Sequence, residues 1–370
     1  MPEKLNVGVL FGGLSGEHDV SLVSAASVMD AMDPEKYRII PIGITKEGRW
    51  LAGGDPLKAL QEQDIPGDCR FATIITDPAS PGLLMLDRSG AGIGSSFISL
   101  DLVFPVLHGP YGEDGTIQGL LELAGIPYVG AGVLASAAGM DKEIMKILFR
   151  HRGLNVGEFL TFHAWRWETE QDLIVLEIEE KLGYPCFIKP ANMGSSVGIS
   201  KAFRREMLVQ GVNDALHFDL KVIVEANIAG REIECAVLGD EKPRASVPGE
   251  IVPCNEFYDY RAKYLDNRSR LLIPAPLEKE ISESIQACAI EAFLATECSG
   301  LGRVDFFYQS EKKKIIVNEI NTMPGFTSIS MYPKLWEFSG VPYPDLIDKL
   351  IKIARNRFRR KKGLLSSPGN

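Results

Sequence analysis

Two short polar segments in the last third of the chain carry the clearest chemistry. Arg303-Val304-Asp305-Phe306 is followed, after a lysine-rich stretch, by Asn318-Glu319-Ile320-Asn321. If the two segments form a hairpin that pairs Asp305 with Glu319, all the polar side chains share one face, because strand side chains alternate. Adjacent carboxylates repel each other, and a divalent cation removes that cost. Oxygens of Asp305, Glu319 and Asn321 suit Mg²⁺ with positions left for water and phosphate. A solvent-facing hairpin with incidental charges is the alternative.

Two lysines lie in segments that we expect to be ordered. Lys189 is inside the apolar segment 186–190, and Lys142 follows Asp141, which is expected to cap a helix. Burying an unpaired ammonium is costly, so Lys189 is expected to have an anionic partner. The nearby loop 194–198 offers backbone N–H groups and hydroxyls that could hold a phosphate, although an ordinary turn accounts for it equally well.

Two glutamates bracket a predicted turn at residues 229–230. Either Glu225 or Glu232 could bind the ribose hydroxyls of a nucleotide, and the backbone of residues 225–228 could meet the adenine edge. Exposed glutamates at strand ends are the alternative.

Two loops follow predicted strands, where doubly wound sheets place ligand groups. His108 opens the glycine-rich loop 108–115, although a lone histidine is more often an ordinary loop residue. In the loop 12–17, Glu17 stands at the predicted start of a helix, where it would repel a pyrophosphate but could hold an ammonium group. The glycine spacing of this loop differs from a dinucleotide-binding fingerprint.

Hydrophobic periodicity predicts the elements that position these residues. Strands alternating with helices predict a parallel α/β sheet in the N-terminal region, a small central α+β domain and a larger C-terminal α+β domain. In the helix after Asp141, residues Ile144, Ile147 and Leu148 mark the apolar face. The long polar segment 253–270 is typical of a lid. The predicted strands are 5–10, 37–44, 100–107, 186–190, 197–202, 222–225, 232–238, 245–252, 302–308 and 315–321, and the predicted helices are 17–32, 141–153, 168–182 and 277–296.

Composition excludes several classes of protein. A chain of 370 residues predicts two or three domains. A net charge of -9 and a pI near 5.3 argue against nucleic-acid binding. Neither an export signal nor an apolar run long enough to span a membrane is evident, so we expect cytoplasmic residence. The six cysteines are widely spaced, which is typical of free thiols in a reducing compartment.

Several motif blocks run in order along nearly the whole chain. They are GGLSGEHDVS at 12–21, HG at 108–109 with GEDG at 112–115, MDK at 140–142, KP at 189–190 with GSSVG at 194–198, EFYDY at 256–260 with KY at 263–264, GRVD at 302–305 and NEINTMPG at 318–325. Together they resemble the D-alanine-D-alanine ligase family. The resemblance implies a three-domain ATP-grasp fold, with domains at 1–135, 136–225 and 226–370 and a lid at 253–270.

The resemblance also implies an activity and the residues that perform it. The expected reaction joins two D-alanine molecules with ATP, through an acyl phosphate, and supplies peptidoglycan synthesis; two Mg²⁺ ions, or Mn²⁺, would assist, and a homodimer is expected. Implied catalytic residues are Glu17, Ser195, Tyr264, Arg303, Gly325 and Ser330. Implied substrate ligands are Glu17, His108 and Ser330. Implied ATP ligands are Lys142, Lys189, Ser195, Glu225, Ala226, Ile228, Glu232 and Lys263, and implied metal ligands are Asp305, Glu319 and Asn321.

Some segments and alternatives remain outside this reading. Asn227 replaces an aromatic residue that some relatives carry near the adenine, and residues 64–94 match no motif and are expected to be an insertion without chemistry. The basic end 355–362 is expected to be a solvated helix terminus. A D-alanine-D-lactate ligase is the nearest alternative, and Tyr264 favours the dipeptide instead. A non-catalytic nucleotide-binding protein is the second alternative.

Overall fold

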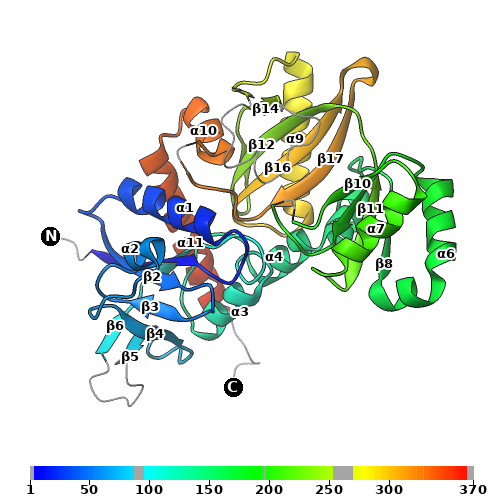
Figure 1. Cartoon of the computed structure of the whole chain (residues 1–370). Helices are drawn as coiled ribbons and strands as arrows, with labels where there is room; N and C mark the ends of the chain where they lie inside the picture. Colours follow the sequence, from blue (N-terminus) through cyan, green and yellow to red (C-terminus); the bar gives the residue numbers. More distant parts are fainter. Residues whose placement is uncertain (1–3, 87–95, 196, 253–269, 328, 365–370) are drawn as a thin grey trace, which may run out of the picture.

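A computed structural model describes residues 4–86, 96–195, 197–252, 270–327 and 329–364. These residues form three β-sheets that follow one another along the chain (Figure 1). The order of the sheets agrees with the three domains expected from the sequence. No helix in the described ranges is both long and apolar enough to cross a bilayer.

The first sheet has seven strands in the order β6-β5-β4-β3-β2-β1-β7. Its strands are β1 (Leu5–Gly12), β2 (Tyr37–Ile44), β3 (Trp50–Ala52), β4 (Arg70–Ile75), β5 (Gly82–Leu86), β6 (Ser96–Ser99) and β7 (Leu102–Val106). Helices α1 (His18–Ala31), α2 (Pro56–Glu62) and α3 (Thr116–Leu123) pack beside it, and α4 (Val133–Met140) leads from α3 toward β17 (Lys314–Asn321) of the third sheet.

The parallel sheet predicted for this region exists only around β1, which pairs in parallel with β2 and β7. From β2 to β6 every pairing is antiparallel. The physical reason is the short connections: Thr45 and Arg49 close a tight turn between β2 and β3, and a parallel pairing would need a long crossover. Residues 64–94, expected to be an insertion, contribute β4 and β5 to the sheet.

The second sheet has four antiparallel strands in the order β10-β9-β11-β8. They are β8 (Phe159–His163), β9 (Cys186–Pro190), β10 (Ser200–Ala202) and β11 (Lys221–Ala226), and the helices α6 (Ala164–Lys181) and α7 (Arg205–Ala215) pack on them. This unit has a hydrophobic core of its own.

The third sheet contains β12 (Arg231–Gly239), β13 (Arg244–Ala245), β14 (Gly249–Val252), β15 (Arg270–Leu272), β16 (Gly300–Gln309) and β17 (Lys314–Asn321). The 3₁₀ turn η1 (Ser310–Lys312) joins the last two strands, at the turn that the sequence predicts. Helix α9 (Lys279–Ala295) covers one face through residues such as Ile285 and Phe293, and α10 (Met331–Phe338) packs on β12.

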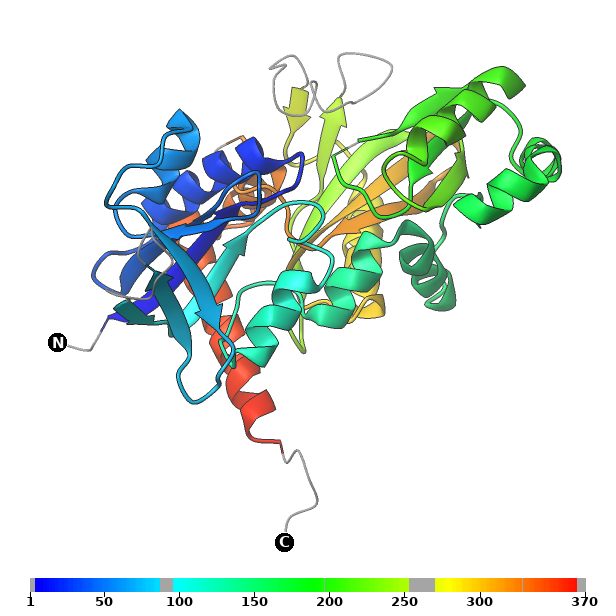
Figure 2. The same ribbon diagram turned by 60° about the horizontal axis from the view of Figure 1, so that its bottom comes forward.

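Each sheet with its helices is called a unit. The last helix, α11 (Tyr343–Lys362), returns to the first unit, which contains the seven-stranded sheet (Figure 2). Its side chains share one core with β1 and β7. The basic end was expected to be solvated, but three of its residues make specific contacts. The Arg357 guanidinium donates to the Gly130 carbonyl at 2.5 Å and the Tyr128 carbonyl at 3.1 Å, Lys361 pairs with Glu122 at 2.6 Å, and Arg360 pairs with Asp240.

Helix α5 (Lys142–His151) lies between the second and third units. Asp141 caps it as predicted, accepting from the backbone N–H groups of Glu143 and Ile144. The predicted apolar face was wrong, because Ile144 and Ile147 are 42% and 48% exposed. The helix instead buries Lys142, Met145, Lys146 and Phe149, since the two lysines reach polar partners in the interior.

The five described cysteines are free thiols, as the sequence predicts, and Cys254 lies outside the described residues. Burial raises the pKa of Cys235 and that of Cys298 to about 12. These two thiols are therefore protonated packing residues.

The loop after β1 depends on a glycine that brings the chain close to β2. Gly12 has φ 89°, and a Cβ there would lie 2.2 Å from the Ile44 carbonyl oxygen. We therefore expect Gly12→Ala to lower the free energy of unfolding by about 2–4 kcal/mol, measured by urea denaturation.

Two other glycines distinguish the cost of the positive φ from the cost of the close approach to β2. Gly153 has φ 76° with no atom near its position for a Cβ, and Gly16 has neither problem. Gly153→Ala should cost about 1 kcal/mol and Gly16→Ala close to nothing. Equal losses in all three variants would contradict the role of the close approach.

Candidate active site

A cavity of about 760 Å³ lies where the three units meet. The carboxyl-terminal ends of β1 and β7, the strands β9 and β11, and the hairpin β16–β17 all contribute residues to its wall or to the loops beside it. The predicted site residues that line it are Glu17, His108, Lys142, Lys189, Ser195, Glu225, Ala226, Ile228, Glu232, Arg303, Asp305, Glu319, Asn321, Gly325 and Ser330. Lys263 and Tyr264 lie outside the described residues.

The hairpin β16–β17 has the predicted register. Arg303 is opposite Asn321 and Asp305 is opposite Glu319, with a shift in register immediately after Asp305. These four side chains are partly buried and face the cavity, whereas Val304 and Ile320 are buried on the opposite face. Alternation along the strands therefore places two carboxylates, one amide and one guanidinium together.

The side chains on this face contact one another directly. Arg303 donates from Nε and Nη2 to the two oxygens of Asp305, both at 2.7 Å, and its Nε lies 3.0 Å from Glu234. The amide nitrogen of Asn321 donates to Asp305 at 3.0 Å. Arg303, one of the implied catalytic residues, is thus held by two carboxylates of its own chain.

The donor set of this face fits a hard divalent cation. Asp305 and Glu319 supply carboxylate oxygens. The amide nitrogen of Asn321 donates a hydrogen bond to Asp305, which leaves the amide oxygen as a possible metal ligand. Carboxylate and amide oxygens are typical ligands of Mg²⁺ or Mn²⁺ beside a nucleotide.

The lysines face the hairpin from the other side of the cavity. Lys189 Nζ lies 2.6 Å from Glu225 Oε2, so its anionic partner is within the chain rather than only a phosphate. Lys142 Nζ donates to the Met193 carbonyl at 2.6 Å. Burial lowers the pKa of Lys142. Burial also opposes the charge of Lys189, but Glu225 and Glu319 together raise the pKa of Lys189.

A third lysine, Lys146, was missed by sequence reasoning. Its Nζ lies 3.1 Å from Glu225 Oε1 and donates to the Asn318 carbonyl at 2.9 Å. Burial opposes ionisation of Glu225, but Lys146 and Lys189 together hold the pKa of this carboxyl at about 2. Lys146 lies four residues after Lys142, on the same face of the helix, and this spacing is the sequence feature that could have identified it as a site residue.

Another part of the cavity wall holds a buried carboxylate. Glu17 is 7% exposed and accepts a hydrogen bond from Ser195 Oγ, so two of the implied catalytic residues are in contact. A Cβ at Gly109 or Gly194 would lie 2.9 or 2.7 Å from Glu17 Oε2, so glycine at both positions allows the carboxylate to fit between two loops. Ser195 itself has φ 47°.

His108 and Glu113 connect this end to the third unit through Met323. The Nδ1 of His108 lies 3.0 Å from the Met323 carbonyl oxygen, and Glu113 accepts from the backbone N–H groups of Met323 at 3.0 Å and Gly109 at 2.7 Å. Burial lowers the pKa of His108, while burial and the charge of Glu17 raise that of Glu113 to about 8. Glu113 belongs to the GEDG motif at 112–115 but was not predicted as a site residue.

The loop after β17 completes the wall. Ser330 Oγ accepts from the Thr327 backbone N–H at 3.0 Å and lies 2.7 Å from the Thr327 hydroxyl. A Cβ on Gly325 would lie 2.8 Å from Ser330 Oγ. Ser330, an implied substrate ligand, and Gly325, an implied catalytic residue, therefore lie next to each other.

The expected adenine edge is only partly available. The Ala226 backbone N–H donates to the Glu158 carbonyl at 3.0 Å, and that of Asn227 donates to the Pro185 carbonyl at 3.3 Å. These two donors therefore face the protein rather than a base. Apolar side chains that line this end of the cavity include Phe187, Ile228 and Phe307.

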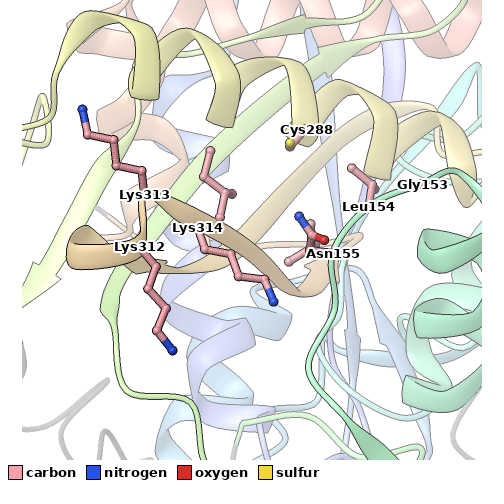
Figure 3. Close-up of a pocket in the computed structure, with 9 residues that line it drawn as sticks. Gly153, Leu154, Asn155, Cys288, Lys312, Lys313 and Lys314 are labelled. Carbon is pink, nitrogen blue, oxygen red and sulfur yellow. The ribbon is translucent and has the colours of Figure 1, made fainter.

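A second cavity of about 360 Å³ lies beside the β16–β17 turn, away from the predicted site residues (Figure 3). Its lining includes Cys288, Lys312, Lys313 and Lys314. The three lysine side chains point in different directions, and Lys313 pairs with Glu278 at 2.9 Å. The lysines therefore do not converge on one ligand.

Comparison with known proteins agrees with this geometry. A family model described as the D-ala D-ala ligase N-terminus matches residues 6–131, and one described as the D-ala D-ala ligase C-terminus matches residues 148–352. The chain is 50% identical to a D-alanine--D-alanine ligase of Natranaerobius thermophilus, covering 97% of each chain. It is also 50% identical to one of Caldicellulosiruptor bescii, covering 98% of each.

Solved structures give the same result. The D-alanine-D-alanine ligase of Coxiella burnetii has a TM-score of 0.83 at 38% identity, covering 97% of this chain and 96% of that one. The VanG D-Ala:D-Ser ligase of Enterococcus faecalis has a TM-score of 0.84 at 37% identity, covering 95% and 100%. The expected three-domain ATP-grasp fold is confirmed, and the chain belongs to the D-alanine-D-alanine ligase family.

Proposed function

We propose that this chain uses ATP to join two D-alanine molecules into D-alanyl-D-alanine. The observation that supports the proposal most strongly is one cavity with two chemically different ends. A carboxylate hairpin faces buried lysines at one end, and the Glu17–Ser195 pair lies at the other. The relatives that are 50% identical over nearly their full length carry the same named activity.

The lysine end suits the phosphates of a nucleotide. Lys142 and Lys189 line the cavity, and Lys263 of the proposed lid would add a third cation. Glu232 is the better candidate for the ribose hydroxyls, because both oxygens of Glu225 are engaged by lysines. Phe187, Ile228 and Phe307 offer apolar surface to the base.

The other end suits two amino acids. Glu17 would bind the ammonium group of the first D-alanine. Hydrogen bonds from Ser195 and Tyr264 would hold the Glu17 carboxylate in place. His108 is buried with a lowered pKa, so it would act there as a neutral hydrogen-bonding group. Ser330 would bind the carboxylate of the second D-alanine.

The proposed reaction has two steps that balance. A carboxylate oxygen of the first D-alanine bonds to the γ-phosphorus of ATP while the bond to the bridging oxygen breaks, and ADP leaves. The free amine of the second D-alanine then bonds to the acyl carbon, inorganic phosphate departs, and the nitrogen gives up its proton. Arg303 and the Gly325 N–H would stabilise the negative oxygen formed in the second step.

Divalent cations, Mg²⁺ or Mn²⁺, would be held by Asp305, Glu319 and Asn321 and would supply neutralisation of phosphate charge. For its part, the chain positions the phosphates with Lys142 and Lys189 and excludes water beneath the proposed lid 253–270. The domain limits 1–135, 136–225 and 226–370, cytoplasmic residence and a homodimer stay predictions from the sequence.

A phosphate-release assay tests the function. With ATP and Mg²⁺ present, release should require D-alanine, and mass spectrometry should show the dipeptide as the main product. In competition near neutral pH, D-serine and D-lactate should give minor products. A mainly ester product would assign the chain to D-lactate, and nucleotide binding without release under any of these conditions would leave only a binding protein.

Tyr264→Phe tests the proposed lid. Removing the hydroxyl should weaken the hydrogen-bonded group at Glu17 and Ser195 and shift the second substrate toward hydroxy acids. The measurement is the ratio of dipeptide to ester from an equimolar mixture of D-alanine and D-lactate. An unchanged ratio would remove Tyr264 from the choice of substrate.

Asp305→Asn tests the metal face. Losing one carboxylate should reduce metal-dependent turnover at least roughly tenfold and raise the Mg²⁺ concentration needed for half-maximal rate. Thermal unfolding should change much less. Asp172→Asn, an exposed change of the same kind on α6, should leave both readings unaltered. A stability loss proportional to the activity loss would indicate a purely structural Asp305.

A further inference from the structure

Lys146 lies deep in the molecule and joins two of its sheets. Its side chain is 3% exposed and comes from α5, while its partners are Glu225 on β11 and the Asn318 carbonyl on β17. Burying an ammonium requires such partners, because its hydration is lost. Lys146 is not among the described residues that line the cavity, so it does not reach the nucleotide directly.

One carboxylate serves two lysines. Glu225 accepts Lys189 at Oε2 at 2.6 Å and contacts Lys146 at Oε1 at 3.1 Å, with its own side chain 11% exposed. Lys189, in contrast to Lys146, lines the cavity and is 12% exposed. Lys146 therefore contacts the Glu225 carboxylate from the protein interior, and Lys189 contacts it from the cavity side.

The surrounding charges favour an incoming anion. Lys142 is influenced by Glu319, Lys189, Glu225 and Lys146, so three ammonium groups lie near two carboxylates. The ammonium groups of Lys142 and Lys189 line the cavity. A phosphate placed in the cavity would attract Lys189 away from Glu225, and the carboxylate would then depend on its remaining partner.

We propose that Lys146 is a positioning residue that stays paired with Glu225 while Lys189 exchanges Glu225 for a phosphate oxygen of the nucleotide. Without Lys146, that exchange would leave the buried carboxylate without a directly paired cation, so Glu225 would retain Lys189. Lys146 thus acts through Glu225 and Lys189 and touches no reacting atom. The inference rests on the proposed function, since it needs ATP to bind in this cavity.

Lys146→Met removes the charge and keeps a side chain of similar length. Calorimetric titration with ATP and Mg²⁺, without D-alanine, should show a Kd roughly ten- to a hundredfold higher than that of the unmodified chain. In the phosphate-release assay, KM for ATP should rise more than kcat falls. Lys146→Arg should recover most of the affinity.

Lys221→Met is the matched control. Lys221 is 12% exposed and pairs with Asp141 at 2.9 Å and with Glu143, in the same unit but without contact to Glu225. It should bind ATP within about twofold of the unmodified chain. A similar loss in both variants would overturn the proposal, because it would show that any buried lysine of this unit has the same effect.

A second variant separates the pairing from general support of the fold. If Lys146 acts as the cation of Glu225, Lys146→Met combined with Glu225→Gln should bind ATP as well as Glu225→Gln alone. This comparison holds even if Lys146→Met by itself does not fold. Weaker binding by the double variant, or unchanged binding by Lys146→Met, would overturn the inference. Absence of ATP binding by the unmodified chain would instead contradict the proposed function.

Discussion

The arrangement of the cavity depends on a buried carboxylate, that of Glu225. A carboxylate at this depth is stable only with cations beside it, and the two that it has come from β9 and α5. Lys146 extends the connection to β17, the strand that carries Glu319 and Asn321. The contacts of Lys146 therefore balance the charge of Glu225 and also connect the second sheet to the third at the nucleotide end of the cavity.

The amino-acid end depends on a different connection. Met323 follows β17, yet its carbonyl and N–H are bound by His108 and Glu113 from the loop after β7. Gly325 of the cavity wall lies two residues further on, so a loop of the first unit holds the backbone beside it. The nucleotide end is thus built from the second and third units, whereas the amino-acid end also joins Glu17 of the first unit to Ser195 of the second. A complete site requires all three, which accounts for motif blocks spread along the whole sequence.

The sequence predicted the elements whose geometry is local and repetitive. The alternation of two in a strand placed Arg303, Asp305, Glu319 and Asn321 on one face, and the observed register agrees. Helix α5 was interpreted wrongly for a physical reason. Its buried face carries two lysines whose partners are remote in sequence, so the apolar Ile144 and Ile147 indicated the exposed side. The contacts of Met323 likewise depend on tertiary structure that no local pattern encodes. The antiparallel half of the first sheet, by contrast, follows from short connections such as residues 45–49, which the prediction did not take into account.

The return of α11 to the first unit has a mechanical consequence. Residues of β1 and β7 share one continuous hydrophobic core with Tyr332, Leu346 and Leu350, and Arg357 ties the end of the helix to the loop at 128–130. The first and last thirds of the chain therefore form a single stiff frame. The four-stranded sheet has a separate core and meets that frame chiefly through polar contacts. The two α5 lysines join this smaller body to the frame, because Lys142 contacts Met193 and Lys146 contacts both Glu225 and Asn318.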